Sequence, residues 1–114
     1  MDKDIFKRFR LIKKISNGKI KTGLVTNGSL FVKEKIEELE QSELDELIFS
    51  IDALTEETYK KVRQGLNFQV VIKNIKNIID SNFNGHLAVK FVVQKDNMAE
   101  LEDFKKYWLN NNIP

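Results

Sequence analysis

The sequence contains no cysteine, and this absence excludes several kinds of chemistry. Without thiols the chain forms no disulfide, offers no thiolate nucleophile and ligates neither zinc nor an iron–sulfur cluster through sulfur. It contains a single histidine, His86, which follows Gly85 at the start of an apolar stretch. One histidine makes a metal site only with help from carboxylates, and none lies beside His86 in the sequence. We therefore expect no metal site, and we expect His86 to be a surface residue where a strand begins.

Long apolar runs and a strong charge imbalance are also absent. No apolar run approaches the ~20 residues that a membrane-spanning helix needs. The N-terminus, Met1-Asp2-Lys3-Asp4, is charged and lacks the apolar core of a signal peptide. The net charge is only +2, so binding to a phosphate backbone has little support. The basic pairs Lys7-Arg8 and Lys13-Lys14 favour a solvated helix face over a nucleic-acid patch. We expect a cytoplasmic protein that binds neither membrane nor nucleic acid.

The composition is that of an ordinary globular domain. The chain has 114 residues, of which 41% are hydrophobic and 32% charged. A chain of this size forms one domain and buries roughly two thirds of its unfolded surface. We find no linker and no low-complexity segment, so we expect a single domain over residues 1–114.

One stretch, Leu44 to Asp52, organises the predicted fold, and it contains a buried strand over residues 47–52. Polar residues close this apolar run, at Ser50 and Asp52. Thr55 then offers an N-cap for a helix that Gly65 interrupts. The same alternation predicts strands over residues 20–26 and 87–93. Apolar residues at helical spacing predict further helices over residues 5–15, 31–40, 67–79 and 98–108, with Asp4 as the first N-cap. For the last helix, Asn97 and Glu100 have the spacing of a capping box.

Helices therefore alternate with strands in an α/β fold. The Asn27-Gly28 pair is a strong hairpin signal, but the helical spacing of residues 31–40 argues against a hairpin. Strands that are separated by helices of this length pair in parallel, through right-handed crossovers.

Polar residues gather where the predicted strands end. They fall on one parity of their strands: Thr26, Ser50, Asp52, Lys90 and Gln94. In parallel sheets, ligands bind beyond these carboxyl ends. An open doubly wound sheet would need apolar residues on both faces, so the wall of a barrel, with a polar inner face near its mouth, fits better. The alternative is that these residues are ordinary polar strand ends that face solvent.

Three segments in this order resemble one known family. They are Leu24-Val25-Thr26-Asn27-Gly28, Ser50-Ile51-Asp52 and the stretch from Val89 to Asn97. They resemble the radical S-adenosylmethionine (radical SAM) superfamily, in the branch of peptide-modifying maturases and the molybdenum-cofactor cyclase. The helix start from Thr55 to Tyr59 also fits that branch, and the resemblance covers nearly the whole chain. It implies the third to fifth βα units of a partial (βα)6 barrel, a three-stranded fragment of a TIM-like barrel, with the preceding helix.

The resemblance also implies a role for each polar strand end. Thr26 would line the cofactor cavity, and Ser50 would contact the methionyl carboxylate or the ribose of S-adenosylmethionine. Asp52 would lie at the same rim, and Lys90 would stand where some relatives have an asparagine. The implied cofactor-binding residues are Thr26, Asn27, Ser50, Asp52, Lys90 and Gln94.

One departure from the family is decisive for activity. The family holds a [4Fe–4S] cluster with three cysteines after its first strand, and this sequence resembles only the part that follows. Because reductive cleavage of S-adenosylmethionine needs an electron from that cluster, we expect the isolated chain to be inactive. We therefore interpret it as a fragment of a radical SAM enzyme.

Two other interpretations remain open. A non-catalytic module could form homo-oligomers through its open barrel edges, or a missing barrel half could cover these edges. A response-regulator-type domain would need an acidic cluster, of which the sequence offers only Asp52.

Overall fold

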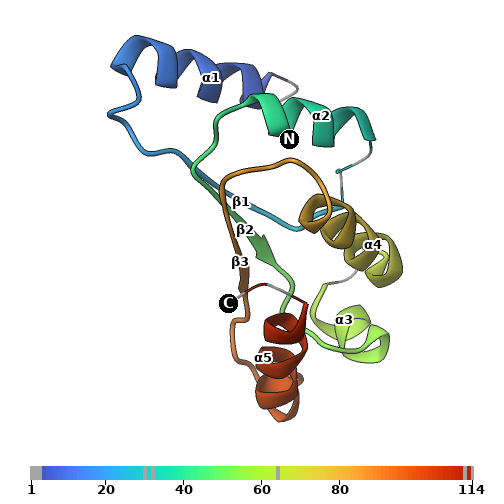
Figure 1. Ribbon diagram of the computed structural model, residues 1–114. Helices are drawn as coiled ribbons and strands as arrows, with labels where there is room; N and C mark the ends of the chain where they lie inside the picture. Colours follow the sequence, from blue (N-terminus) through green and yellow to red (C-terminus); the bar gives the residue numbers. More distant parts are fainter. Residues whose placement is uncertain (1–3, 30, 32, 64, 112, 114) are drawn as a thin grey trace.

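Helices and strands alternate along the chain as predicted. The structure is a computed structural model that describes residues 4–29, 31, 33–63, 65–111 and 113. The elements are α1 (Ile5–Ser16), β1 (Gly23–Thr26), α2 (Lys33–Gln41), β2 (Glu46–Ser50), α3 (Glu56–Val62), α4 (Phe68–Ile79), β3 (His86–Lys90), the short 3-10 helix η1 (Met98–Glu100) and α5 (Leu101–Asn110) (Figure 1). Within these described ranges no helix is both long and apolar enough to cross a membrane.

The three strands form one parallel sheet in the order β1-β2-β3. The predicted parallel crossovers are confirmed, and Asn27-Gly28 leads toward α2 rather than into a hairpin. All three strands are shorter than predicted, β1 because its pairing begins late, and β2 and β3 because their pairing ends early. The β2–β3 pairing ends at Ser50 and Lys90, so residues 91–93 extend beyond the sheet. The β1–β2 pairing begins at Gly23 and Glu46, which leaves residues 20–22 outside it.

Only one face of the sheet is fully packed. Residues that pair across a parallel ladder point to the same side, so the register assigns each strand residue to a face. The packed face carries Leu24, Thr26, Leu47, Phe49, Leu87 and Val89. Leu47 and Phe49 are fully buried in one apolar cluster with residues of all five α-helices. The opposite face carries Val25, Ile48, Ser50, Ala88 and Lys90, and Val25 there is 54% exposed.

This one-sided sheet fits the wall of a partial barrel. In a barrel, helices cover the outer face of the strands, whereas the inner face packs against the other strands. Here α3 and α4 lie together beside one side of the sheet (Figure 1). The α/β fold class and the three-stranded parallel fragment are thus confirmed.

Local signals explain where several helices begin and end. Thr55 is extended, and its hydroxyl accepts a hydrogen bond from the Thr58 N–H at 3.3 Å, which confirms the predicted N-cap of α3. Asn67 caps α4 in the same way, through the Val70 N–H. Asn17 ends α1 with a left-handed φ of 54°. Asp4 precedes α1, but its side chain makes no capping hydrogen bond.

The basic face of α1 is not entirely solvated. Lys13 is only 8% exposed, and its ammonium forms an ion pair with Asp45 and donates to the Ile20 carbonyl at 2.7 Å. Asp45 also accepts a hydrogen bond from the Thr22 N–H at 2.7 Å. These interactions lower the pKa of Asp45: the hydrogen bond from Lys13 is the largest cause, and the hydrogen bond from Thr22 is the next. The prediction of a solvated Lys13 is therefore wrong, because this side chain joins α1 to the amino-terminal end of the sheet.

Candidate functional site

A polar constellation lies where β2 ends, at the rim formed by the carboxyl ends of the strands. Ser50 is the last residue of β2 and pairs with Lys90 in the register, so the two side chains are neighbours on the open face. Two residues later, Asp52 adopts a left-handed φ of 64°. This conformation is uncommon for residues with a side chain, although aspartate tolerates it better than most. It turns the chain sharply away from the sheet toward α3.

Both carboxylate oxygens of Asp52 are bound by the protein. Oδ1 accepts a hydrogen bond from the Val92 N–H at 2.7 Å, and Oδ2 accepts one from Arg63 Nη2 at 2.8 Å. The Asp52 side chain is 8% exposed. We infer that Asp52 organises the rim from beneath, because a bound and buried carboxylate has little capacity for a ligand.

Arg63 completes this constellation, and the sequence analysis missed it. It is the C-cap of α3, and its Nη2 donates to the Ser50 hydroxyl as well as to Asp52. Its side chain is 27% exposed. No periodic pattern indicates Arg63, because it lies beyond the apolar stripe of α3. The available signal was its position after a very short helix, from which a long side chain can reach back to the strand end.

A buried tyrosine underlies the ion pair. Tyr59 is fully buried, and within the described residues its hydroxyl has no hydrogen-bond partner. Burial raises the pKa of Tyr59; the charge of Arg63 opposes this rise, and the charge of Asp52 adds to it. Tyr59 thus stays neutral at physiological pH and adds no charge beneath the rim.

The turn after β1 is a separate part of the rim. The Thr26 hydroxyl accepts a hydrogen bond from the Gly28 N–H at 3.2 Å, and Asn27 Oδ1 accepts one from the Ser29 N–H at 2.8 Å. Gly28 has a φ of 80°, and an added Cβ would lie 3.4 Å from Val71 Cγ1. Both predicted polar side chains therefore hold the turn itself.

The predicted common face of these residues needs a correction. Thr26 pairs with Phe49 and not with Ser50, so it lies on the helix-packed side of the sheet. The parity rule failed because the register between β1 and β2 joins an even-numbered residue to an odd-numbered one. Lys90 does share the face of Ser50. Gln94 is exposed beyond the end of β3, outside the ladder.

The predicted capping box at Asn97 and Glu100 is also wrong. Asn97 is 1% exposed and makes no capping hydrogen bond; its side chain bonds across to the chain after β2. Glu100 accepts hydrogen bonds from the Leu54 N–H and from the hydroxyls of Thr55 and Thr58, at 2.7 to 2.8 Å. Burial alone would raise the pKa of Glu100, but these hydrogen bonds outweigh it and lower the pKa.

This lowered pKa predicts an acid-dependent loss of stability. Because the pKa of Glu100 is lower in the folded chain than in the unfolded chain, ionised Glu100 stabilises the fold above the unfolded value of about 4.3. The stabilisation is lost as the pH falls through the lowered pKa. In urea denaturation between about pH 7 and pH 3, Glu100→Gln should be less stable than the natural chain near neutrality, and the gap should narrow in acid. Glu57→Gln, which removes an exposed charge from α3, is the control; a gap that stays constant with pH would contradict the prediction.

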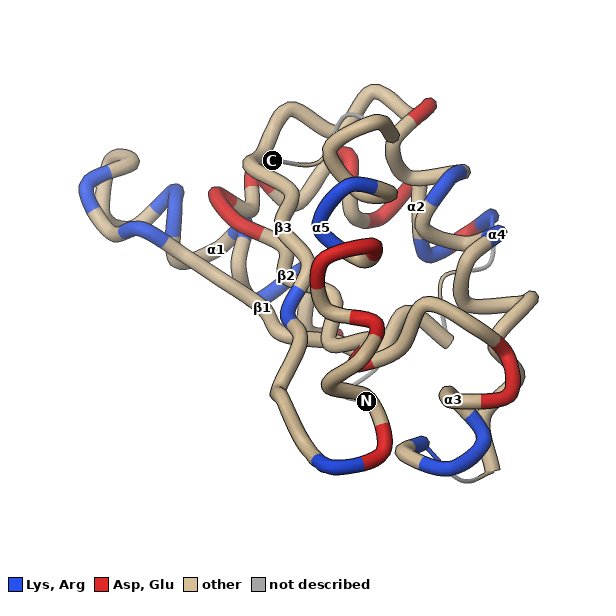
Figure 2. The backbone as a smooth tube through the Cα atoms, turned by 90° about the horizontal axis from the view of Figure 1, so that it is seen from below, with Lys and Arg blue, Asp and Glu red and all other residues tan. Residues whose placement is uncertain are grey.

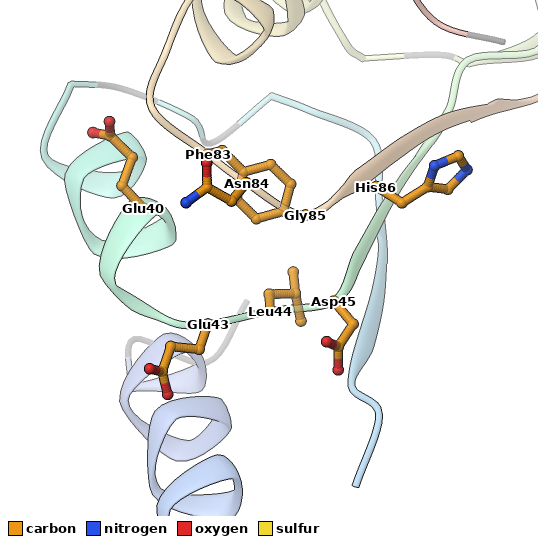
Figure 3. Close-up of a pocket in the computed structure, with 8 residues that line it drawn as sticks. All are labelled: Glu40, Glu43, Leu44, Asp45, Phe83, Asn84, Gly85 and His86. Atoms are coloured by element: carbon orange, nitrogen blue, oxygen red, sulfur yellow. The ribbon is translucent and has the colours of Figure 1, made fainter. Parts of the chain in front are cut away.

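A pocket of about 330 Å³ lies at the opposite, amino-terminal end of the strands (Figure 3). Its lining residues are Glu40, Glu43, Leu44, Asp45, Phe83, Asn84, Gly85 and His86. His86 begins β3 as predicted, is exposed, and points away from Glu40 and Glu43 (Figure 3). Across the described part of the chain, no three histidine, aspartate or glutamate side chains converge to hold a metal ion. Two of the carboxylates are already engaged, Asp45 with Lys13 and Glu40 with the Asn82 N–H.

Figure 2 shows how the charged residues are distributed along the backbone. Basic and acidic residues are interspersed over the helices, with basic residues prominent along α1 (Figure 2). The polar rim at the strand ends is therefore the strongest candidate site.

A parallel sheet with helices on one face and a polar rim at its carboxyl ends defines a wall of the (βα)-barrel class, in which this rim carries the ligand site. The profile of the Radical SAM superfamily matches residues 1–107. The chain belongs to the radical SAM superfamily, which confirms the resemblance of its three motifs.

Curated relatives within this family carry the name GTP 3',8-cyclase. The chain is 27% identical over 104 residues to a probable GTP 3',8-cyclase of Methanococcus aeolicus. The aligned region covers 91% of the chain and 34% of the relative. The chain is 28% identical over 97 residues to the probable GTP 3',8-cyclase of Methanocaldococcus jannaschii, covering 85% and 32%. A GTP 3',8-cyclase of Limosilactobacillus fermentum is 29% identical over 110 residues, covering 96% and 32%. The chain thus spans about a third of the length of these relatives.

The family implies two cofactors, and the residues present fit only one of them. S-adenosylmethionine carries a carboxylate and hydroxyl groups, for which the guanidinium of Arg63 and the hydroxyl of Ser50 are suitable partners. A [4Fe–4S] cluster needs thiolates, and the chain contains none. The chain therefore offers no cysteine ligand for such a cluster.

Proposed function

We infer that this chain supplies part of an S-adenosylmethionine site in a radical SAM enzyme. The observation that carries this proposal is the Arg63 guanidinium, which Asp52 holds against Ser50 at a strand end. Arginine binds carboxylates well because its planar fork presents several N–H donors. Both hydrogen bonds described for the Arg63 guanidinium use Nη2 alone, which leaves donors on the same group for a methionyl carboxylate. Ser50 and Lys90 would then face the rest of the cofactor from the open side of the sheet.

Catalysis would need more than this chain. In radical SAM enzymes, S-adenosylmethionine supplies a carbon radical once an electron from the cluster has cleaved it. Since the chain lacks cysteine, we propose that it binds the cofactor without cleaving it and works with protein segments that hold the cluster. The cyclisation of GTP, for which the relatives are named, would likewise require segments beyond the matched third of their length.

Calorimetric titration with S-adenosylmethionine tests the site directly. We expect the purified chain to bind the cofactor, and we expect Ser50→Ala to weaken binding about 2- to 10-fold, because one neutral hydrogen bond contributes about 0.5–1.5 kcal/mol. Ser16→Ala is the matched control, since Ser16 lies at the end of α1, outside the rim. Absence of binding at millimolar cofactor would refute the proposal.

We also infer that the chain associates with a second copy through its open sheet. In the described sheet, β1 and β3 each have one strand neighbour, so each offers an unpaired edge. Unpaired edges readily accept further strands, and the exposed Val25 adds an apolar contact on the open face. This association would bury the surface that the helices leave uncovered.

Sedimentation over a range of concentrations tests this association. We expect a dimer or larger assembly, and we expect Val25→Lys to shift it toward monomer. Val70→Lys is the control, because Val70 is similarly exposed on α4 rather than on the open sheet face. A monomer mass that does not change with concentration would rule out self-association.

A further inference from the structure

The chain after β3 is held to the chain after β2 by side chains rather than by backbone pairing. The ladder ends at Ser50 and Lys90, and one more backbone hydrogen bond joins the Ile51 N–H to the Lys90 carbonyl at 3.2 Å. Beyond this point, Asp52 Oδ1 accepts from the Val92 N–H at 2.7 Å. Asn97 Nδ2 donates to the Val92 carbonyl at 3.0 Å and to the Asp52 carbonyl at 2.9 Å. The side chains of Asp52 and Asn97 thus take the place of the backbone hydrogen bonds that would continue the ladder.

Asn97 is the centre of this junction. Its Oδ1 accepts from the Gln94 N–H at 2.8 Å, so the amide group makes three hydrogen bonds to backbone atoms while it is 1% exposed. The residue it holds, Asp52, has the left-handed φ of 64°. Such a backbone conformation persists only where neighbouring groups enforce it. The bond from Asn97 to the Asp52 carbonyl provides that constraint.

Glu100 holds the same loop at a second point. Its carboxylate binds the Leu54 N–H at 2.7 Å and the Thr55 hydroxyl at 2.8 Å. Thr55 is the N-cap of α3, and Arg63 is the C-cap of this short helix. Asn97 therefore fixes the residue that holds the Arg63 guanidinium, and Glu100 fixes the start of the helix that carries Arg63.

We propose that Asn97 and Glu100 are positioning residues, which set the guanidinium of Arg63 against Ser50 for a carboxylate-bearing ligand. Neither side chain has a described contact with Arg63 or Ser50, so both act through Asp52 and α3. The ligand assignment, S-adenosylmethionine, rests on the proposed function. The positioning of Arg63 does not, and it can be measured in the chain without ligand.

The test combines NMR of the Arg63 side chain with cofactor titration. The Arg63 Nε–H signal, assigned by its loss in Arg63→Lys, is compared between the natural chain and Asn97→Leu, which is nearly isosteric but has no polar atom. We expect a shifted or broadened signal and at least 10-fold weaker binding of S-adenosylmethionine. Asn97→Asp keeps the acceptor for Gln94 and loses both donations, so it serves as a milder second variant if Asn97→Leu does not fold. We expect Glu100→Gln to move the signal less, because its amide oxygen still accepts from Leu54.

Asn74→Leu is the matched control. Asn74 is also buried, and its Nδ2 likewise donates to two carbonyls, those of Gly28 and Ser29, but at the turn after β1. We expect a comparable loss of stability with an unchanged Arg63 signal. An Arg63 signal that is the same in both Asn97 variants as in the natural chain would overturn the proposal. Failure of the natural chain to bind S-adenosylmethionine would instead refute the proposed function and leave the positioning result intact.

Discussion

Arg63→Met should weaken S-adenosylmethionine binding by about 10- to 100-fold. Hydrogen bonds to charged groups contribute about 1.5–3 kcal/mol, which is the source of this range. The variant has a second effect, because it leaves the Asp52 carboxylate without its cation beside the position proposed for the ligand carboxylate. The two neighbouring negative charges, on Asp52 and on the ligand carboxylate, would repel each other and oppose binding. Calorimetric titration at constant ionic strength measures the combined loss.

Two variants separate charge from geometry in this prediction. Arg63→Lys keeps the positive charge but loses the planar fork, so its affinity should fall between those of the natural chain and Arg63→Met. Lys60→Met removes a cation from the same helix, at a side chain that is 72% exposed and pairs with Glu56. We expect nearly unchanged binding for Lys60→Met. Equal affinity of Arg63→Met and the natural chain would remove Arg63 from the site.

Phe49→Ala should have the largest effect on folding, about 3–5 kcal/mol, which is typical for removal of a buried aromatic ring. Phe49 lies fully buried on the central strand, and its ring packs edge-on against Phe31 at 6.4 Å. It also lies beneath Gly28, so the cavity would loosen the turn after β1 as well. Because small domains are stable by only about 5–15 kcal/mol, much of the total stability would be lost.

Urea denaturation measures this loss as a lower midpoint at an unchanged slope. Phe49→Leu keeps most of the buried volume and should cost distinctly less than Phe49→Ala. Val25→Ala truncates an exposed side chain of the same sheet and should change the free energy of unfolding little. If Phe49→Ala cost no more than Val25→Ala, the assignment of the packed face would be wrong.

The elements of the fold could be predicted because their signals are local. Apolar spacing along α4 and the Thr55 cap of α3 depend on neighbouring residues only, and the structure confirms both. The parallel sheet followed from the length of the intervening helices. The predicted strand boundaries were less accurate where they depend on pairing with a neighbouring strand, as at the end of β3.

The site could be predicted only in part, because its geometry depends on the tertiary structure. Ser50 and Lys90 are neighbours as expected, since both end strands that pair in register. The face of Thr26 depends on a register that no local pattern encodes. Arg63 and Asn97 reach the rim across loops, and their hydrogen bonds to Asp52 join residues 11 and 45 positions apart. For Asn97 the sequence even gave a misleading signal, because the spacing to Glu100 matches a helix cap.

The one-sided sheet also limits which insertions and deletions the chain can tolerate. Side chains of β2 alternate between the packed face and the open face, so one residue added between Leu47 and Phe49 would exchange the two sides downstream. Phe49 would then face the open side, and Ser50 would point into the apolar cluster. The helices and loops can vary in length without this effect. Related proteins should therefore differ in length between strands and keep a fixed residue count within β2.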